Sequence, residues 1–343
     1  MAGGSLTLGR DIAIDLGTAN TLIYVKGAGV VLDEPSTAAV DAKSGQLVAV
    51  GWEAKRMWGR APKNIRLVRP LKDGVIADFD VCEKMLRQFI QMVNPNRWNK
   101  PRMIIAVPSD VTGVERRAVQ DAAEFAGARR PVYIIEEPMA AAIGAGLPVH
   151  LPSANLIVDI GGGTTEVAVI SMGGIVTAHS ARVAGDELNE SIIAMFRREF
   201  GLDIGENTAE EIKIQIGSAW PLADELTADV GGRDARSGLP RTQAVTSEQI
   251  RSAMEDPIQL IIDAIKTTLE RTPPELAADI INNGLMLSGG GALLTGLPER
   301  VAADTGIEAH VATDPLLSVV YGCGMTLDNL DAMKDIARTS HLE

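Results

Sequence analysis

The sequence has 343 residues, of which 46% are hydrophobic and 22% charged, as is typical of a folded protein with room for two domains. Its formal charge of −13 disfavours non-specific nucleic-acid binding, because proteins that grip phosphate backbones are normally basic. The two cysteines, Cys82 and Cys323, form no metal-ligand or CxxC pattern, which indicates a reducing cytosol rather than a disulfide scaffold.

The chain opens with a predicted β-hairpin. An aliphatic strand at residues 12–14 leads into Asp15, a polar glycine loop covers residues 16–20, and a second strand follows at residues 21–25. Shorter strands are predicted after it. Helices and buried strands then alternate, and their expected positions are helices at residues 81–93, 115–126 and 138–144 and strands at 103–107 and 132–135.

The opening pattern then returns. A strand at residues 156–158 leads into Asp159, a glycine loop covers residues 160–164, and a second strand follows at residues 167–170. Asp15 and Asp159 lie 144 positions apart. We therefore predict an internal duplication in an α/β protein with mixed sheets.

The last part of the chain mixes helices with short strands. Residues 182–244 are more polar and are predicted to be largely helical, with a flexible stretch at residues 231–233. An amphipathic helix is predicted at residues 258–269. Strands at 284–287 and 309–312 and a final helix at 316–327 complete the prediction, with a glycine break at residues 288–292.

The glycine loops indicate phosphate binding. Glycine lets backbone N–H groups approach phosphate oxygens closely, and Thr18 and Thr164 add hydroxyl donors. Asp15 and Asp159 would repel each other in one cleft unless they shared a cation, which Mg²⁺ on a triphosphate would supply, largely through water. One such loop could be a simple hairpin turn, but its repetition favours a nucleotide site. The chain has no GxxxxGK[ST] segment and no Rossmann-type glycine turn.

Other candidate site residues each allow two readings from the sequence. Glu137, at a strand end before Pro138, could orient an attacking water or accept its proton, or could simply favour a helix dipole. Glu136 is hardly distinguishable from it. Glu210 and Lys213 could contact an adenosine or form a solvated i,i+3 pair. The glycines at residues 289–291 could let the backbone lie flat against an adenosine ring.

Four motifs together resemble the MreB family of bacterial actins, and the similarity runs from about residue 11 to 330. They are residues 11–21 (DIAIDLGTANT), 137–148 (EPMAAAIGAGLP), 158–167 (VDIGGGTTEV) and 287–294 (LSGGGALL). Residues 73–79 and 115–117 resemble the same family.

This resemblance implies an actin-like two-lobed fold, with duplicated ribonuclease-H-like subdomains around a nucleotide cleft. The implied subdomains are IA at residues 6–32, 66–141 and 313–336, IB at 33–65, IIA at 142–181 and 245–312, and IIB at 182–244.

The resemblance also implies a site that binds ATP and hydrolyses it slowly, coupled to polymerisation. Asp15 and Asp159 would serve Mg²⁺, and Glu137 would be the catalytic glutamate. Thr164 would help to link the γ-phosphate to lobe position. Phosphates would be held by Gly17, Thr18, Ala19, Asn20, Gly161, Gly162, Gly163 and Thr164, and adenosine by Glu210, Lys213, Gly289, Gly290, Gly291 and Ala292.

The family's partners are implied in the same way. We expect filaments of paired protofilaments, with the helix from Val114 on the pairing face, and no nucleic acid. They would lie on the inner face of the cytoplasmic membrane and guide wall-synthesis machinery through membrane proteins, which would maintain rod shape. Residues 1–8 lack the family's amphipathic membrane helix, so Trp98, beside Arg97 and Lys100, is the candidate membrane contact or else an ordinary surface tryptophan.

Rival functions on the same fold fit less well. A heat-shock-type chaperone would carry a substrate-binding domain after the ATPase, and a sugar or acid kinase would need a second-substrate pocket that we cannot identify. A magnetosome-aligning or plasmid-segregating actin remains the alternative.

Overall fold

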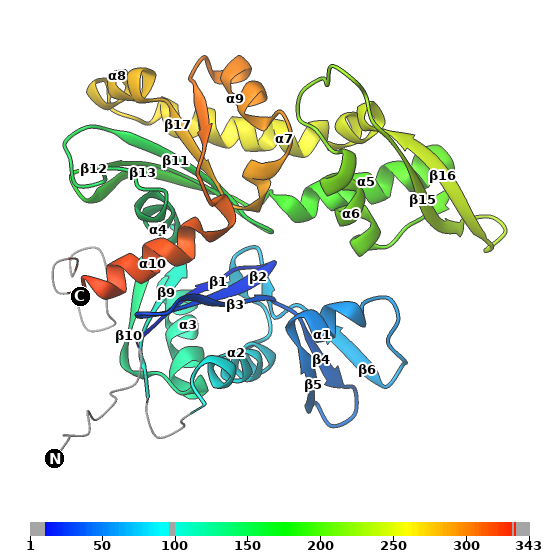
Figure 1. The fold of residues 1–343 in the computed structure, drawn as a ribbon, viewed down its shortest axis with the longest axis horizontal. Helices are drawn as coiled ribbons and strands as arrows, with labels where there is room; N and C mark the ends of the chain where they lie inside the picture. The colour runs from blue at the N-terminus through cyan, green and yellow to red at the C-terminus, as the bar shows by residue number, and fades with distance from the viewer. Residues whose placement is uncertain (1–10, 96–99, 331–332, 334–343) are drawn as a thin grey trace. The chain divides into compact units, whose positions relative to one another are not determined.

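The computed structural model describes residues 11–95, 100–330 and 333. The chain divides into two compact units (Figure 1). Unit 1 comprises Met1–Val149 and Leu317–Glu343, and unit 2 comprises His150–Leu316. Among the described residues, no helix combines the length and the apolar character needed to cross a bilayer.

Unit 1 is built on a five-stranded sheet in the order β10-β9-β1-β2-β3. The strands are β1 Ile12–Leu16, β2 Asn20–Val25, β3 Gly29–Pro35, β9 Arg102–Val107 and β10 Arg129–Glu136. β1, β2 and β3 form an antiparallel meander, whereas β9 and β10 run parallel to β1. The predicted first hairpin is therefore confirmed, and parallel crossovers extend its sheet.

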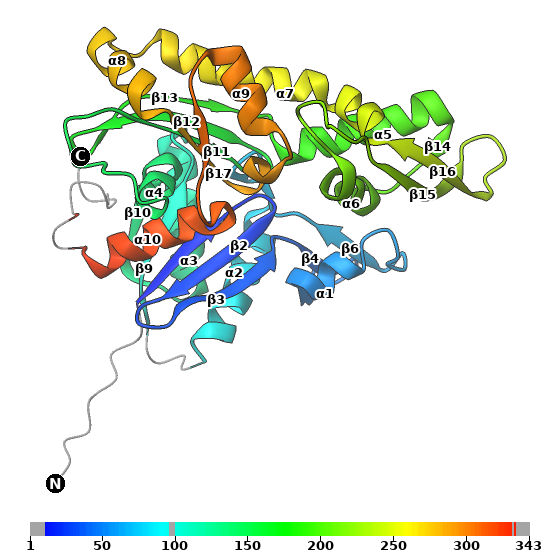
Figure 2. The same ribbon diagram turned by 45° about the horizontal axis from the view of Figure 1, so that its top comes forward.

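Helices cover both faces of this sheet. α2 (Phe79–Val93) and α3 (Gly113–Ala126) pack on one face, and α4 (Glu137–Gly144) and α10 (Ser318–Asp328) lie on the other (Figure 2). Ile12, Ile14 and Leu16 belong to the α2/α3 core. Because side chains alternate along a strand, Asp15 points to the opposite face, the one that α4 and α10 cover.

Glycines bring α4 and α10 into backbone contact. A Cβ on Gly144 would lie 1.8 Å from the Ser318 carbonyl oxygen, and one on Gly322 would lie 1.8 Å from that of Ala140. No larger residue fits either position without moving a helix. This close crossing fixes α4, which begins at Glu137, against the rest of unit 1.

A small subdomain completes unit 1. Its three-stranded sheet has the order β5-β4-β6 and carries the short helix α1. The elements are β4 Ala38–Asp41, β5 Leu47–Val50, α1 Gly51–Arg56 and β6 Ile65–Val68, followed by the two-stranded pair β7 Leu71–Lys72 and β8 Val75–Ile76.

Unit 2 repeats the five-stranded sheet of unit 1. Its order, β13-β12-β11-β17-β18, matches β3-β2-β1-β9-β10, with the same antiparallel and parallel pairings. The strands are β11 Asn155–Ile160, β12 Thr165–Ser171, β13 Gly174–Ala181, β17 Leu285–Ser288 and β18 Ala309–Val311. The predicted duplication is thus confirmed as two sheets with one topology.

The helices of unit 2 include one that was predicted too short. α7 runs over Ser247–Glu270, where we expected a start at residue 258, after Pro257. The helix passes through this proline, and a capping box between Thr246 and Gln249 fixes its true start. The other helical elements are α5 Gly185–Phe200, α6 Glu206–Ile216, α8 Pro274–Asn283 and α9 Leu297–Thr305, with 3₁₀ turns η1 Gly290–Leu293 and η2 Pro315–Leu317.

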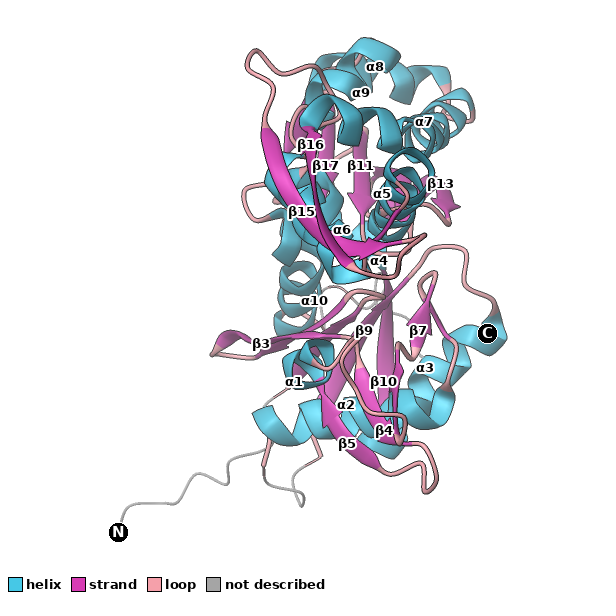
Figure 3. Cartoon of the chain, turned by 90° about the vertical axis from the view of Figure 1, so that its right-hand side faces the viewer, coloured by secondary structure: helices cyan, strands magenta, loops and turns pink. Residues whose placement is uncertain are grey.

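The flexible stretch predicted at residues 231–233 is wrong. These residues lie within β15 (Thr227–Asp234), which pairs with β16 (Pro240–Thr246) in a long hairpin and with β14 (Leu202–Asp203) at its end (Figure 3). A Cβ on Gly232 would lie 2.7 Å from the Asp203 carbonyl oxygen, so glycine here permits close strand packing rather than flexibility.

Candidate functional site

The predicted site residues gather at one edge of each duplicated sheet. Asp15 and Asp159 lie near the carboxyl ends of β1 and β11, Glu137 follows β10, and Gly289 follows β17. In open α/β sheets, ligands bind at the carboxyl ends of the parallel strands. Each unit therefore presents a half site at the edge where this rule predicts one.

The first glycine loop is held in shape by bonds from elsewhere in unit 1. The Gly17 N–H donates to the Asn20 carbonyl oxygen at 3.1 Å, which closes the hairpin. The Ser36 hydroxyl donates to the Gly17 carbonyl at 2.6 Å, and the Ser36 N–H donates to the Ala19 carbonyl at 2.8 Å. The Thr18 hydroxyl accepts the Gly74 N–H at 3.0 Å.

The second glycine loop has the same closure but a different clamp. The Gly161 N–H donates to the Thr164 carbonyl at 2.9 Å, as Gly17 does to Asn20. The N–H groups of Gly185 and Asp186, at the start of α5, donate to the carbonyls of Gly161 and Gly162 at 3.2 and 2.8 Å. These bonds fix the loop so that its remaining N–H groups can face a phosphate.

Asp159 is a buried carboxylate with unsatisfied hydrogen-bonding capacity. Its side chain is 6% exposed, and Oδ1 has no hydrogen-bond partner among the described residues. Burial raises the pKa of Asp159 to about 6, the nearby Glu166 charge adds to the rise, and a hydrogen bond from Ser288 opposes it. A cation or its water shell would satisfy this oxygen and favour the ionised form.

These residues fit Mg²⁺ better than a metal held entirely by protein. Within residues 11–95 and 100–330, no group of three or more His, Cys, Asp or Glu side chains could hold a metal ion. Mg²⁺ keeps several of its waters and is bound through one or two carboxylates and substrate phosphates. Asp159, with its unsatisfied oxygen, suits that role in unit 2, and Asp15 occupies the matching position in unit 1.

Glu137 and Asp15 share one neighbourhood in unit 1. Glu137 is the first residue of α4 and is 8% exposed, whereas Glu136 ends β10 and is half-buried. Burial raises the pKa of the Cys323 thiol on α10 well above its usual value, and the charges of Asp15 and Glu137 raise it further. Both carboxylates therefore lie close to this buried thiol, next to the first glycine loop.

The third glycine loop lies against the second. A Cβ on Gly289 would lie 2.3 Å from the Ile160 carbonyl oxygen, and one on Gly291 would lie 2.2 Å from Ile160 Cγ2. These two glycines are thus required for packing against the end of β11. Residues 290–293 form a single 3₁₀ turn, and Ala292 within this turn is buried.

The other predicted residues are distributed less uniformly. The Lys213 ammonium donates to the Gly185 carbonyl at 2.9 Å, which places it beside the second loop, and Glu210 is half-buried one turn earlier on α6. The Asn20 side chain donates to Asp33 at 2.8 Å. Trp98 lies outside the described residues.

The sequence did not reveal the residues that clamp the loops. Ser36, Gly74 and Gly185 lie 19, 56 and 24 positions from the loop residues they contact, and no motif marks them. The tertiary fold brings them to the loops: Ser36 follows β3, Gly74 lies between β7 and β8, and Gly185 begins α5.

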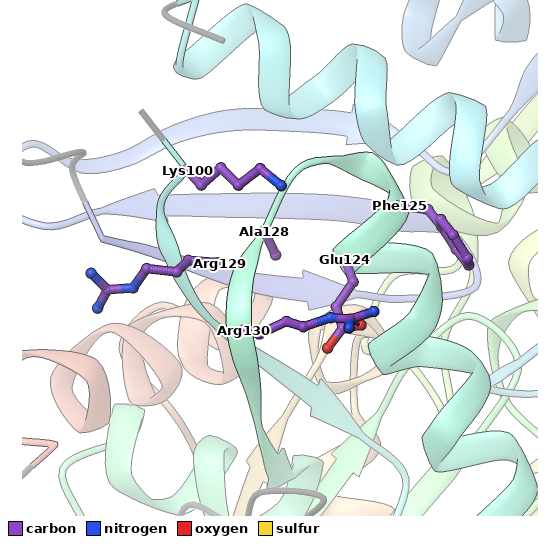
Figure 4. Close-up of a pocket in the computed structure, with 6 residues that line it drawn as sticks. All are labelled: Lys100, Glu124, Phe125, Ala128, Arg129 and Arg130. Carbon is purple, nitrogen blue, oxygen red and sulfur yellow. Dashed lines mark hydrogen bonds and ion pairs between the residues drawn. The ribbon is translucent and has the colours of Figure 1, made fainter. Parts of the chain in front are cut away.

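One pocket lies away from these half sites. Lys100, Glu124, Phe125, Ala128, Arg129 and Arg130 line a cavity of ≈ 450 Å³ (Figure 4). It lies where β9 and β10 begin, at the edge of the sheet opposite to Glu137, and Arg130 is already paired with Glu124 at 2.7 Å. We assign it no role in nucleotide binding.

The fold and half sites define the class of protein as an actin-like nucleotide-binding protein. A solved structure of MreB5 of Spiroplasma citri bound to ADP has a TM-score of 0.90 at 39% identity, covering 96% of this chain and 98% of that one. The same protein bound to AMPPNP matches equally well. A MamK double helical filament structure, at 22% identity and a TM-score of 0.79, supports the fold alone.

The sequence comparisons identify the family. The sequence model of the MreB/Mbl protein family matches residues 9–335, and the chain therefore belongs to that family. The cell shape-determining protein Mbl of Bacillus subtilis is 51% identical over 325 residues, or 94% of this chain and 97% of Mbl. The cell shape-determining protein MreB of Escherichia coli is 51% identical over 328 residues, or 94% of each chain.

Proposed function

We propose that this chain binds ATP with Mg²⁺, hydrolyses it slowly and polymerises into filaments that determine cell shape. The observation that carries the proposal is the repetition, in both units, of one hairpin with an aspartate before a glycine loop closed by the same N–H to carbonyl bond. Such loops direct backbone donors at phosphate groups. The ADP and AMPPNP bound to MreB5 support the choice of an adenine nucleotide.

Binding would use both loops and the two aspartates. Thr18 and Ala19 in unit 1 and Gly162 to Thr164 in unit 2 would donate to phosphate oxygens, while Gly289 to Ala292 and the α6 residues Glu210 and Lys213 would receive the adenosine. Asp15 and Asp159 would hold Mg²⁺ through its water shell. When bound, Mg²⁺ neutralises charge on the β- and γ-phosphates.

Hydrolysis would depend on Glu137. A buried carboxylate at the start of α4 can orient a water and accept its proton, provided that it is held within hydrogen-bond reach of that water. The glycine contacts between α4 and α10 supply the rigidity that this role requires. Glu136, which lies half-exposed at the strand end, lacks the same burial and is not assigned this role.

Filament formation and cell-shape control follow from the family. Mbl and MreB, each about half identical to this chain, are named cell shape-determining proteins. We further propose that the filaments lie on the inner face of the cytoplasmic membrane, contact it near Trp98, and guide membrane proteins of wall synthesis. These relatives disfavour a magnetosome or plasmid role.

Two measurements test the proposal. Isothermal titration calorimetry should detect ATP binding in millimolar Mg²⁺ and much weaker binding in EDTA. Sedimentation with electron microscopy should then show nucleotide-dependent filaments. A folded protein that takes up no adenine nucleotide in excess Mg²⁺ would refute the site, and one that binds nucleotide but stays monomeric with and without lipid would refute the filament.

A further inference from the structure

Unit 2 carries a row of four polar side chains across its five-stranded sheet. Ser288 on β17, Asp159 on β11, Glu166 on β12 and Ser180 on β13 are consecutive register partners, so that each lies directly beside the next (Figure 1). Residues paired in this way point to the same face of a sheet. We call these four residues the polar row. The proposed Mg²⁺ site accounts for Asp159 but not for Glu166.

The polar row faces away from the main core of unit 2. Val158 and Val167, the chain neighbours of the two carboxylates, belong to the core that also contains apolar residues of α5 and α7. Because side chains alternate along a strand, Asp159 and Glu166 lie on the opposite face of the sheet. This face is the counterpart of the one that carries Asp15 in unit 1.

The two carboxylates of the polar row are both buried. Glu166 is 0% exposed and Asp159 is 6% exposed. The Ser180 hydroxyl donates to Glu166 Oε1, whereas Asp159 Oδ1 has no hydrogen-bond partner among the described residues. Like charges directly opposite each other destabilise a pair of strands, and burial adds to that cost. The protein therefore keeps these neighbouring carboxylates at a cost in stability that a cation would offset.

The duplicated hairpin of unit 1 has no carboxylate at the position of Glu166. The register partner of Asp15 is Leu22, which is buried. Leu22 and Glu166 occupy equivalent positions, because each lies opposite the aspartate that precedes a glycine loop. The same hairpin thus folds with an apolar residue in this place. The hairpin topology does not require Glu166, and its presence indicates a function that belongs to unit 2.

The chemistry of hydrated Mg²⁺ fits such a pair of carboxylates. Mg²⁺ keeps several of its waters when it binds to a protein, and those waters donate hydrogen bonds to acceptors around the metal. Acceptors outside the direct ligands orient the shell and tune the affinity for the metal. A carboxylate that lies beside Asp159 and is held by the Ser180 hydroxyl is an acceptor of this kind.

We propose that Glu166 is a positioning residue of the nucleotide site, whose carboxylate accepts a hydrogen bond from a water of the Mg²⁺ shell beside Asp159. The inference rests on the proposed function and adds one residue to the half site of unit 2. Glu166 acts on the metal through water and makes no direct bond to it. Without a cation, the same negative charge opposes the approach of a triphosphate. Glu166 therefore makes nucleotide binding depend more strongly on Mg²⁺.

Calorimetry of ATP binding to the full-length protein, in millimolar Mg²⁺ and in EDTA, tests this proposal. In Mg²⁺, Glu166→Gln should bind ATP about tenfold more weakly than the wild type, because the water shell loses a charged acceptor. In EDTA it should bind ATP at least as tightly as the wild type, because a negative charge has been removed. The matched control, Glu308→Gln, removes one charge at an exposed position of unit 2 and should change neither affinity.

Two further variants separate this role from a structural one. Glu166→Leu introduces the residue type that unit 1 has at the equivalent position, and it should show the same loss of affinity in Mg²⁺. Ser180→Ala keeps the carboxylate but removes the hydroxyl that holds it, so ATP affinity in Mg²⁺ should fall about threefold. Urea unfolding of the nucleotide-free Glu166→Gln protein should have a midpoint no lower than that of the wild type. A lower midpoint together with weaker ATP binding in both Mg²⁺ and EDTA would make Glu166 a residue of the fold and overturn the inference.

The Mg²⁺ dependence of hydrolysis provides the final measurement. Glu166→Gln should need about tenfold more Mg²⁺ for half of its maximal single-turnover rate, while the rate at saturating Mg²⁺ and ATP stays within a few-fold of the wild type. A large fall in the saturated rate with an unchanged Mg²⁺ requirement would place Glu166 at the attacking water and overturn the inference. Unchanged ATP affinity of Glu166→Gln in Mg²⁺ would also overturn it. A folded wild type that binds no ATP in Mg²⁺ would instead refute the proposed function.

Discussion

In the first hairpin, the glycine loop is held by Ser36 and Gly74, which lie in other parts of unit 1, whereas in the second it is held by backbone N–H groups at the start of α5. The backbone of the two loops is nevertheless closed by the same bond. One loop geometry has thus been kept while the residues that support it differ. The two units preserve the parts that the proposed nucleotide site would use, the loop for phosphate and the aspartate for Mg²⁺, and vary the rest.

The acidic residues around the two glycine loops differ in burial, although the two loops share one backbone closure. Glu137-Pro138 follows β10, and Asp314-Pro315 follows the equivalent strand β18. Glu137 is buried, whereas Asp314 is exposed. Conversely, Asp159 is the aspartate with the unsatisfied buried oxygen. The two copies of the scaffold therefore differ, with the buried Glu137 in unit 1 and the buried carboxylate with an unsatisfied oxygen in unit 2.

The largest effect is expected from removing Glu137. Glu137→Gln keeps the size of the side chain but removes its proton-accepting charge, so single-turnover ATP hydrolysis should slow by about 10²- to 10³-fold. Calorimetry should show ATP affinity within a few-fold of the wild type. Phosphate release measured with a fluorescent sensor provides the rate.

Two neighbouring carboxylates serve as controls for Glu137. Glu136→Gln alters the adjacent residue, and Asp314→Asn alters the equivalent position of unit 2. Both should retain near-normal hydrolysis. If Glu136→Gln slowed hydrolysis as much as Glu137→Gln, burial would not distinguish the roles of these two neighbours. The assignment of Glu137 as the general base would then fail.

The next effect concerns Asp159 in nucleotide-free protein. Its pKa of about 6 exceeds the ordinary 3.8, so the folded state binds this proton more tightly than the unfolded state does, and stability falls as pH rises through this window. Asp159→Asn removes that penalty and should raise the free energy of unfolding by about 3 kcal/mol at pH 7.5 but by less at pH 5. Denaturant titrations at both pH values provide the test.

The exposed Asp256 supplies the control, since the free energy of unfolding of Asp256→Asn should show no gain that grows with pH. In Mg²⁺ and ATP the wild type should be more stable than Asp159→Asn, because the wild-type carboxylate then has a cation nearby. If the gain in unfolding free energy of Asp159→Asn did not depend on pH, burial would not destabilise the ionised form of the Asp159 carboxylate.

The sequence was sufficient for the strands and loops of the site because short aliphatic runs ending in Asp and glycine leave little choice of structure. Prediction from the sequence failed where long-range packing determines the local structure. Gly231 and Gly232 indicated flexibility, yet the strand needs Gly232 to pass close to Asp203. The amphipathic pattern indicated a helix start at residue 258, yet the capping residue Thr246 lies three turns earlier. Propensity describes a residue alone, whereas these outcomes depend on its neighbours.

The candidate site was predictable to a similar extent. The repeated Asp and glycine pattern located both loops, but nothing in the sequence showed that Gly289 and Gly291 are required by Ile160. The difference in burial between Glu136 and Glu137 also becomes visible only in the folded structure. Residue identity thus predicts which chemistry is possible, and tertiary packing determines which of the candidate side chains are buried.

A smaller effect distinguishes the loop glycines. A Cβ at Gly17 would lie 2.8 Å from the Asn20 carbonyl oxygen, whereas one at Gly161 would lie 3.3 Å from that of Thr164. Gly17→Ala should therefore destabilise the protein by about 1–3 kcal/mol, and Gly161→Ala by less. Gly113→Ala, at an open helix start, is the control for thermal unfolding. Equal losses of stability in Gly17→Ala and Gly161→Ala would mean that the difference between these two Cβ distances does not affect stability.

The smallest effect separates the two loop threonines. The Thr18 hydroxyl accepts a bond from the Gly74 N–H, while the Thr164 hydroxyl forms no hydrogen bond within the described residues. Thr18→Val should cost nucleotide-free protein about 1 kcal/mol, because the Gly74 N–H loses its acceptor, and Thr18→Ser should restore it. Thr164→Val should leave that stability unchanged but weaken ATP binding about three- to tenfold, the loss of one hydrogen bond to a phosphate. Chemical denaturation and calorimetry on the three variants measure both quantities. If Thr164→Val instead destabilised the free protein and bound ATP normally, the Thr164 hydroxyl would stabilise the fold rather than bind phosphate. The expected difference between the two loop threonines would then be wrong.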